Sequence, residues 1–518
     1  MVIETTIDQT NPSASNNSEA ATPALAEQLY AAVDLGSNSF HLVVSRYEHG
    51  RFVVVDRHRE SVRLASGLDA KGNLSDEVRQ RALACLEQFS QLLNLIPEEN
   101  IRVVGTNAMR RMRDDSDFFN AAELALGAEI EIIAGREEAR LIYLGVVKGS
   151  ELGDEGRIVV DIGGGSTEVI VGASDEPQHR ESLEMGCVVV SNQFFADGVL
   201  TAERFEKAIL HCELAIQPVV RLFKAQGWLH AIGCSGTIRA LSGMLDAMGW
   251  ANGEITKSAL HNLYEHVIAA GDVEKVEISG LNDDRRPVFA GGLSILMAVF
   301  ELLDLERMQV SDCALRDGVL QDLVGRRTKN DARDIAISAL IKRCAIDTRH
   351  AEFVCGTALK LYDHVSSSWD IDTQLIRKML EWSALVHELG MLISHDNYHK
   401  HGAYVIQNAD MVGFARRDQM LLSSLVKGHR RKFPLRDFER LPASIVTPAK
   451  RLAVILRVAV LLHRTRSTPL PQGLSASAKG GQLKLSFPDK WLLEHPLTAA
   501  DLEQEQRWLS LVGIDLKY

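Results

Sequence analysis

The sequence lacks several features that would place it in a familiar class. No apolar run approaches the roughly 20 residues that a helix needs to span a bilayer. Its first residues show no basic segment followed by an apolar core, the pattern of a secretory signal. No Gly-x-x-x-x-Gly-Lys-[Ser/Thr] loop is present, which excludes a P-loop enzyme. We therefore expect a cytoplasmic protein whose association with membranes is at most peripheral.

Paired cysteines and an excess of positive charge are also missing. The seven cysteines include no Cys-x-x-Cys pair, so neither a zinc site nor a disulfide framework is predicted. The formal net charge is −12 at pH 7. This argues against general binding of nucleic acid, which needs a basic face. A polyanionic substrate remains compatible with this charge, because a local basic groove can focus field lines within an acidic protein.

What the chain does contain is one strand–turn–strand pattern in two copies. Residues 159–171 run from apolar residues through an aspartate, three glycines, two hydroxyl residues and a glutamate into a second apolar run. Residues 31–44 repeat this order with an aspartate, a glycine and small polar residues. Such glycine turns let backbone N–H groups form an anion site. Ordinary β-hairpins have similar turns, but two copies favour a duplicated fold with a phosphate clamped between them.

Changes of pattern along the 518 residues predict several regions. Residues 1–27 are rich in Ser, Asn, Thr and Ala and predict a disordered tail. Residues 28–145 and 146–327 each mix strand and helix patterns and predict two α/β domains. Residues 328–460 show helical periodicity without a strand pattern, which predicts a separate all-α domain. Residues 461–518 predict a small α+β module with a β-hairpin.

Six motifs in order resemble the exopolyphosphatase / guanosine pentaphosphate phosphohydrolase (Ppx/GppA) family. They lie at residues 32–44, 135–143, 161–170, 185–187, 233–237 and 314–320, and the resemblance covers the chain after residue 28. It implies a duplicated actin/sugar-kinase-like (ribonuclease-H-like) α/β core, an all-α HD-like domain and a small α+β C-terminal module. It also implies a homodimeric, Mg²⁺-dependent hydrolase that removes terminal phosphate from inorganic polyphosphate or from guanosine 5′-triphosphate,3′-diphosphate (pppGpp).

Hydrolysis of a phosphoanhydride needs an in-line water, a base and positive charge on the phosphoryl oxygens. The resemblance assigns the base to Glu138 rather than Glu137, although acids at this position can simply complement the helix dipole. Asp161 and Glu168 are the expected Mg²⁺ ligands. Asp34 is a third candidate ligand, and capping of its own turn is the alternative role. Another divalent cation, or a monovalent cation such as K⁺, is a further candidate cofactor.

Hydroxyl, amide, backbone N–H and guanidinium groups near the turns are the expected phosphate ligands. Helix N-termini and arginine forks both suit phosphate oxygens. These candidates are Ser37, Asn38, Ser39, Arg110, Gly163, Gly164, Gly165, Ser166, Thr167, Ser235, Gly236, Thr237 and Arg316.

The helical domain carries histidines and short basic runs. His350 and the pair His387-Glu388 resemble part of the metal set of HD phosphohydrolases, but a valine stands near Arg457 where the final acid is expected. We therefore do not expect an active second metal site there. A channel for the rest of a polyphosphate chain is the preferred role, and a solvated charged loop is the alternative. The channel residues would be His399, Lys400, His401, His429, Arg430, Arg431 and Lys432.

The motifs of the two α/β domains are compatible with both polyphosphate and pppGpp as substrates. Chain length, the basic histidine-rich stretches and the C-terminal module favour an exopolyphosphatase that also acts on pppGpp. The main alternative is an enzyme that acts mainly on pppGpp. A sugar kinase on the same fold and a non-enzymatic sensor of polyphosphate or nucleotides are further alternatives.

Overall fold

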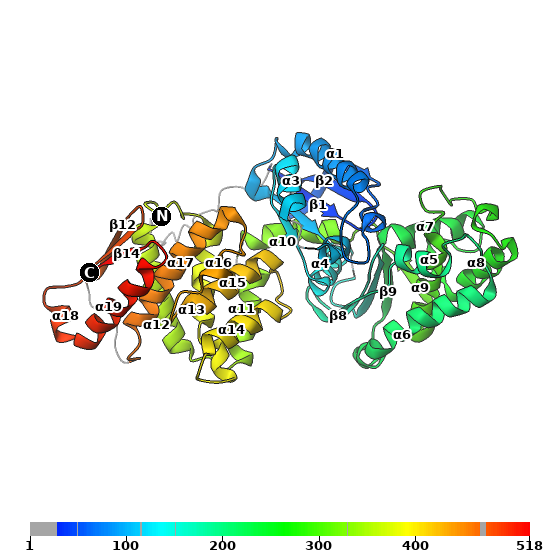
Figure 1. Cartoon of the computed structure of the whole chain (residues 1–518). Helices are drawn as coiled ribbons and strands as arrows, with labels where there is room; N and C mark the ends of the chain where they lie inside the picture. Colours follow the sequence, from blue (N-terminus) through cyan, green and yellow to red (C-terminus); the bar gives the residue numbers. More distant parts are fainter. Residues whose placement is uncertain (1–27, 49, 114–115, 151, 329, 467–472) are drawn as a thin grey trace, which may run out of the picture.

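The computed structural model describes residues 28–48, 50–113, 116–150, 152–328, 330–466 and 473–518. The tail predicted at residues 1–27 lies outside this range. Two α/β lobes, coloured blue to cyan and green in Figure 1, lie beside a helical part coloured yellow to red. Within the described ranges, no helix has the length and apolar character needed to cross a membrane.

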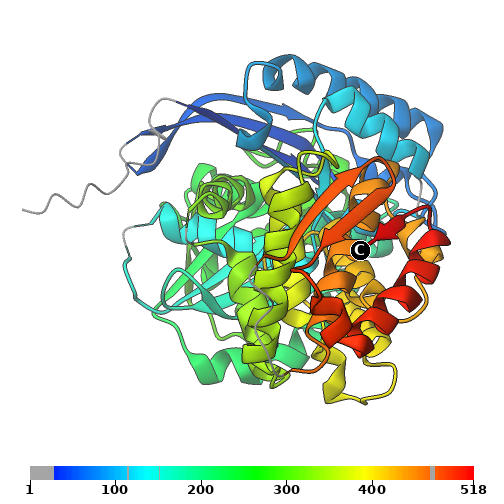
Figure 2. The ribbon, with the colours of Figure 1, turned by 90° about the vertical axis from the view of Figure 1, so that its left-hand side faces the viewer.

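The first lobe is built on a five-stranded sheet of order β3-β2-β1-β4-β5. β1 pairs antiparallel with β2 and parallel with β4, and its central residues are buried because helices cover the sheet. The long β2–β3 hairpin extends beyond the rest of this lobe (Figure 2). The strands are β1 (Leu29–Leu35), β2 (Phe40–Glu48), β3 (Arg51–Glu60), β4 (Ile101–Gly105) and β5 (Ile130–Ile132). The helices are α1 (Asp76–Leu93), α2 (Asn107–Arg111), α3 (Ser116–Leu126) and α4 (Gly135–Lys148).

The second lobe repeats this topology in a sheet of order β10-β11-β9-β6-β7-β8. β6 pairs antiparallel with β7 and parallel with β9, as β1 does with β2 and β4, and an extra strand β10 closes the edge. The duplicated α/β core predicted from the two turns is therefore confirmed. The strands are β6 (Arg157–Ile162), β7 (Thr167–Gly172), β8 (Pro177–Leu183), β9 (His230–Cys234), β10 (Glu254–Thr256) and β11 (Arg307–Val310). The helices are α5 (Cys187–Phe194), α6 (Ala202–Gln226), α7 (Ser235–Ala247), α8 (Lys257–Ala270), α9 (Phe289–Leu302) and α10 (Leu315–Arg326).

Helices α4 and α10 hold equivalent places in the two lobes and pack directly against each other. Their backbones touch at two glycines. A Cβ on Gly318 would lie 1.7 Å from the carbonyl oxygen of Leu141, and one on Gly145 would lie 2.1 Å from that of Ala314. Larger residues would push the helices apart. This close contact brings the N-terminal turns of both helices to the space between the lobes.

The C-terminal third is helical, followed by a small three-stranded sheet of order β12-β13-β14. Between residues 330 and 466, all of them described, there is no strand, as the sequence predicts. The helices are α11 (Ala332–Arg343), α12 (Thr348–Val365), α13 (Gln374–Val386), α14 (Tyr398–Asn408), α15 (Arg416–Gly428), α16 (Leu435–Phe438) and α17 (Ala443–Leu462). They are followed by β12 (Ser475–Lys479), β13 (Gln482–Ser486), α18 (Trp491–Glu494), α19 (Pro496–Ser510) and β14 (Asp515–Lys517).

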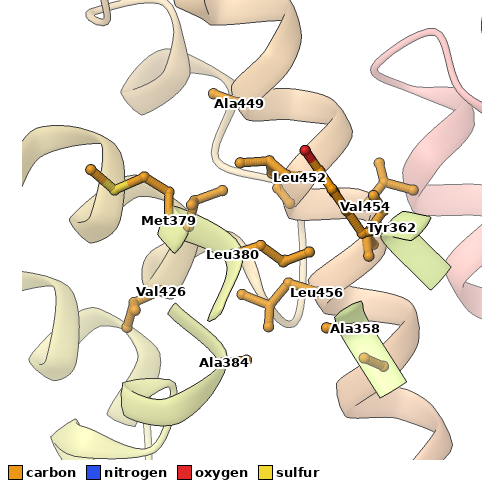
Figure 3. Packing of buried hydrophobic residues seen from close by; sticks show 14 of the residues in the cluster. Ala358, Tyr362, Met379, Leu380, Ala384, Val426, Ala449, Leu452, Val454 and Leu456 are labelled. Atoms are coloured by element: carbon orange, nitrogen blue, oxygen red, sulfur yellow. The ribbon is translucent and has the colours of Figure 1, made fainter. Parts of the chain in front are cut away.

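One apolar core runs through the helices and the small sheet. Leu380 of α13, Leu456 of α17 and Ala358 of α12 converge at its centre (Figure 3). Leu485 of β13 and Leu509 of α19 belong to the same buried cluster. The small sheet therefore packs as part of the helical body.

A buried network of ion pairs lies where the first lobe, α10 and the helical part meet. Asp322 of α10 accepts hydrogen bonds from Arg102 at 2.7 Å, from Arg326 at 3.1 Å and from Arg140. Glu131 accepts from Arg326 at 2.8 Å and from Arg102 at 3.0 Å. Buried charges are tolerated when they are paired in this way. The network therefore holds β4, β5, α4 and α10 in one arrangement.

The network extends into the helical part through the loop before α15. The backbone N–H of Gly413 donates to Glu137 at 3.0 Å, and its carbonyl oxygen accepts from Arg326 at 3.2 Å. Glu137 also forms a bidentate pair with Arg140. Glu137 thus joins the helical part to the helix that carries Glu138.

Candidate functional site

A cavity of about 410 Å³ lies between the two lobes. It is lined by the β1–β2 turn, the β6–β7 turn and the first turns of α4, α7 and α10, so residues far apart in the chain meet there. The predicted site residues that line it are Asp34, Ser37, Asn38, Ser39, Glu138, Asp161, Gly163, Gly164, Gly165, Ser166, Ser235, Gly236, Thr237 and Arg316.

The two duplicated turns face each other across this cavity at close range. A Cβ on Gly164 would lie 3.2 Å from the Cβ of Ser37. A Cβ on Gly165 would lie 2.3 Å from the side-chain oxygen of Asn107, at the start of α2. Glycine is therefore required for the second turn to approach the first lobe. Backbone N–H groups at such turns can cradle an anion.

Helix α7 begins at the wall of the cavity and directs its N-terminus toward it. Ser235, its first residue, has a φ of 94°, a left-handed conformation that is costly for a residue other than glycine. Gly236 allows Arg285 to come close, since a Cβ there would lie 2.1 Å from the guanidinium Nη2. The N–H groups at the start of α7 and the adjacent guanidinium together suit phosphate.

Two aspartates at the ends of the central strands have strongly perturbed acidity. Burial raises the pKa of Asp34 to about 7, with Arg316 opposing the shift and the nearby acids Glu138 and Asp161 adding to it. Burial also raises the pKa of Asp161 to about 6, opposed by the Cys234 thiol, which donates to its Oδ2 at 3.3 Å. The Oδ1 atom of Asp34 is buried and has no hydrogen-bond partner in the described part of the chain. A hard cation would satisfy such oxygens.

Thr167 and Glu168, both predicted site residues, are buried and do not line the cavity. The Thr167 hydroxyl donates to the carbonyl oxygen of Met185 at 2.5 Å. Glu168 is buried and accepts a hydrogen bond from Ser182 at 2.7 Å. Burial, followed by the charges of Glu138 and Asp161, raises the pKa of Glu168 well above its ordinary value. Glu168 therefore shares one electrostatic environment with the acids that line the cavity.

The paired acids of α4 separate into two roles. Glu138 lines the cavity, whereas Glu137 turns away into the buried ion network. Arg110, expected to contact phosphate, does not line the cavity. Its guanidinium donates to Glu138 Oε2 at 2.7 Å and to the carbonyl oxygen of Ile133 at 3.0 Å. Arg110 thus orients Glu138, and its contact with phosphate stays a prediction.

Several residues of the cavity were not identified from the sequence. Arg59, Arg239 and Arg285 line it together with Arg316, so guanidinium groups of both lobes surround it. Burial and these four arginines lower the pKa of His41 to about 2, which keeps its ring neutral. Arg239 lies one helical turn after Ser235 on the same helix, so helical periodicity could have indicated that it faces the cavity. Arg59 on an edge strand and Arg285 in a loop carried no such signal.

A second cavity, of about 740 Å³, lies in the helical part. Of the predicted channel residues, His429, Arg430 and Arg431 line it, while Lys400, His401 and Lys432 do not. His399 is buried, the Arg430 guanidinium lies 4.5 Å from the centre of the Tyr398 ring, and Arg431 pairs with Asp396. A channel role for this set stays a prediction.

Two family sequence models and several known proteins are similar to this chain. Residues 43–327 match the sequence model described as the Ppx/GppA phosphatase family, and residues 332–506 match that of Ppx/GppA phosphatase, domain III. The guanosine-5′-triphosphate,3′-diphosphate pyrophosphatase of Aeromonas hydrophila is 39% identical over 477 residues, 92% of this chain and 96% of that protein. The protein of that name from Vibrio parahaemolyticus is 38% identical over 485 residues, 94% and 97% of the two chains.

A solved structure supports the fold. The exopolyphosphatase of Cytophaga hutchinsonii matches 57% of this chain and 98% of its own with a TM-score of 0.53, at 23% sequence identity.

Proposed function

Because this chain belongs to the Ppx/GppA phosphatase family, whose members hydrolyse phosphoanhydrides, we propose that it removes the terminal 5′-phosphate of pppGpp to give ppGpp. The resemblance seen in the motifs is confirmed by this membership. The observation that carries the proposal is near full-length similarity, at 38–39% identity, to proteins named for pppGpp. It favours what was the alternative function over exopolyphosphatase activity.

The charge of the cavity is consistent with this substrate. pppGpp carries five phosphate groups, and the cavity is lined by Arg59, Arg239, Arg285 and Arg316. Guanidinium forks bind phosphate oxygens in pairs. The start of α7 and the two glycine turns would supply backbone N–H groups to the phosphoryl group that is transferred. Inorganic polyphosphate presents the same terminal chemistry and is the second candidate substrate.

The acids of the cavity fit a divalent cation, which we propose to be Mg²⁺. Asp161 and Asp34 offer buried carboxylate oxygens, one of them without a partner, and Glu168 lies close behind them. These are hard oxygen donors of the kind that Mg²⁺ prefers. When bound, the cation would neutralise charge on the phosphate oxygens. Another divalent cation, or K⁺, remains a candidate for the same region.

Glu138 is the proposed base. It lines the cavity, and Arg110 fixes its carboxylate, so one oxygen can accept the proton of a water directed at the terminal phosphorus. The network around Glu137 keeps the first turn of α4 in place during this step. Residues of the first lobe would position the water, and residues of the second lobe would bind most of the phosphate oxygens.

The proposal is tested by measuring phosphate release from pppGpp and from long-chain polyphosphate with the same enzyme preparation and no added acceptor. We expect a higher kcat/KM for pppGpp and ppGpp as the product. A higher kcat/KM for polyphosphate would restore exopolyphosphatase as the main activity. Dependence of phosphate release on a sugar acceptor would favour a kinase instead, and binding without turnover would favour a sensor.

Binding of Mg²⁺ should release protons in a pH-dependent way. At pH 6, Asp34 is largely protonated and Asp161 about half protonated, since their pKa values are about 7 and about 6. A carboxyl group must lose its proton to bind a metal. Calorimetry in two buffers of different ionisation enthalpy should show release of about one proton or more at pH 6 and clearly less at pH 8.5. Asp34→Asn should reduce the release at pH 6, and an equal release at both pH values would refute this metal site.

A further inference from the structure

Two histidines and a glutamate of the helical part meet away from the catalytic cavity. His350 lies in the first turn of α12, and His387 and Glu388 follow the last residue of α13. One ligand atom of each lies within 4.8 Å of the others, and all three residues are buried. No active metal site was expected here, because the final acid of the HD set is absent. The structure nevertheless brings three potential ligands together.

The ring of His387 is held by a hydrogen bond to the backbone. Its Nδ1 donates to the carbonyl oxygen of Ala384 at 2.7 Å, so its Nε2 carries a free lone pair. This Nε2 is buried and has no hydrogen-bond partner among the described residues, and the side chain is 0% exposed. Leaving a buried polar atom without a partner is unfavourable. Metal-binding histidines commonly donate their other N–H to a backbone carbonyl in this way.

The guanidinium of Arg466 already pairs with the carboxylate of this cluster. Glu388 Oε1 lies 3.8 Å from His350 Nε2 and also accepts a hydrogen bond from the Arg466 guanidinium. The side chain of Glu388 is 7% exposed, whereas that of Arg466 is 42% exposed. Arg466 can therefore withdraw into solvent while Glu388 remains. The cluster is a site for positive charge in which Arg466 competes with any metal ion.

We propose that His350, His387 and Glu388 bind one divalent transition-metal ion of the Zn²⁺ type, separate from the Mg²⁺ of the catalytic cavity. Two imidazole nitrogens and one carboxylate suit zinc, whereas Mg²⁺ prefers oxygen ligands alone. Three protein ligands leave a coordination position open. His350 and Glu388 line the second cavity together with Arg430 and Arg464, so that position faces a space lined by arginines, where water or a small anion can enter.

The test uses Co²⁺ as a visible probe of the full-length protein after removal of metals with a chelator. With excess Mg²⁺ present to occupy the catalytic cavity, we expect one equivalent of Co²⁺ to bind tightly and to give the d–d absorption of a site with nitrogen and oxygen ligands. His350→Gln and His387→Gln should each weaken binding by on the order of 100-fold or more. Arg466→Gln should strengthen it. Asp161→Asn, in the catalytic cavity, should leave this absorption unchanged, and circular dichroism checks that each variant is folded.

Three outcomes would overturn the proposal. One is the absence of a tight Co²⁺ site in the wild-type protein. A second is a d–d absorption of this kind that survives His350→Gln, which decides the matter even where His387→Gln does not fold. The third is an intense thiolate charge-transfer band, which would assign the metal to the cysteines instead.

Discussion

Replacing Glu138 with glutamine should lower kcat for phosphate release by about 10²–10⁴-fold, the usual contribution of a general base. Glutamine keeps the shape of the side chain, and its amide oxygen can still accept the hydrogen bond from Arg110. It cannot take a proton from water. Substrate affinity should stay near that of the wild type, because the arginines and turns that line the cavity are unchanged. Single-turnover kinetics together with equilibrium binding of pppGpp separate these two effects.

Glu181→Gln is the matched control for this variant. Glu181 lies on β8 and forms a partly exposed pair with Arg136 of α4, near Glu138 in the fold but outside the cavity. Its replacement should change kcat little. A kcat for Glu138→Gln close to that of the wild type would refute the assignment of the base.

Replacing Asp322 with alanine should destabilise the protein by about 3–5 kcal/mol, the cost of breaking a buried ion pair by removing one partner. Arg102, Arg140 and Arg326 would all lose an acceptor in a place where water cannot replace it. Urea unfolding followed by circular dichroism measures the change.

The control for Asp322→Ala is a surface pair of the same chemistry. Asp197 is paired with Arg204 but is exposed, so Asp197→Ala should barely move the unfolding midpoint. Equal shifts of the unfolding midpoint for the two variants would show that the buried network does not stabilise the contact between the first lobe, α10 and the helical part.

The same network should make stability fall in acid. Burial alone would raise the pKa of Glu131, but Arg102 and Arg326 outweigh it and hold the pKa at about 2, below the ordinary value of 4.5. A carboxyl group with a depressed pKa in the folded protein stabilises the fold at pH values above its pKa in the unfolded chain. This stabilisation is lost as the pH falls through the folded-state pKa. The unfolding midpoint should therefore decline between about pH 4.5 and pH 2, and less so in Glu131→Gln.

Local patterns predicted much of the fold but only part of the site. The two turns could be recognised in the sequence because each is formed by one short, continuous segment in which an aspartate precedes glycine, as at residues 161–165. The choice of Glu138 over Glu137 came from the family resemblance. The structure supplies a physical reason, since Glu137 is occupied by Arg140 and Gly413 while Glu138 lines the cavity.

The residues missed by sequence analysis are those placed by long-range packing. Arg59 reaches the cavity from an edge strand, and Arg285 reaches it from a loop through the space that Gly236 leaves. Neither position has a periodicity or motif that marks it. Similarly, nothing in the chain near Arg110 indicates that its partner would be Glu138 rather than phosphate.

The most direct test of the central claim is a structure of the Glu138→Gln variant with Mg²⁺ and pppGpp. The account predicts the terminal phosphate between the two glycine turns, within about 3 Å of the backbone nitrogens at the start of α7, with the metal on Asp161. A terminal phosphate bound in the second cavity, or the Mg²⁺ ion bound away from Asp34, Asp161 and Glu168, would contradict it.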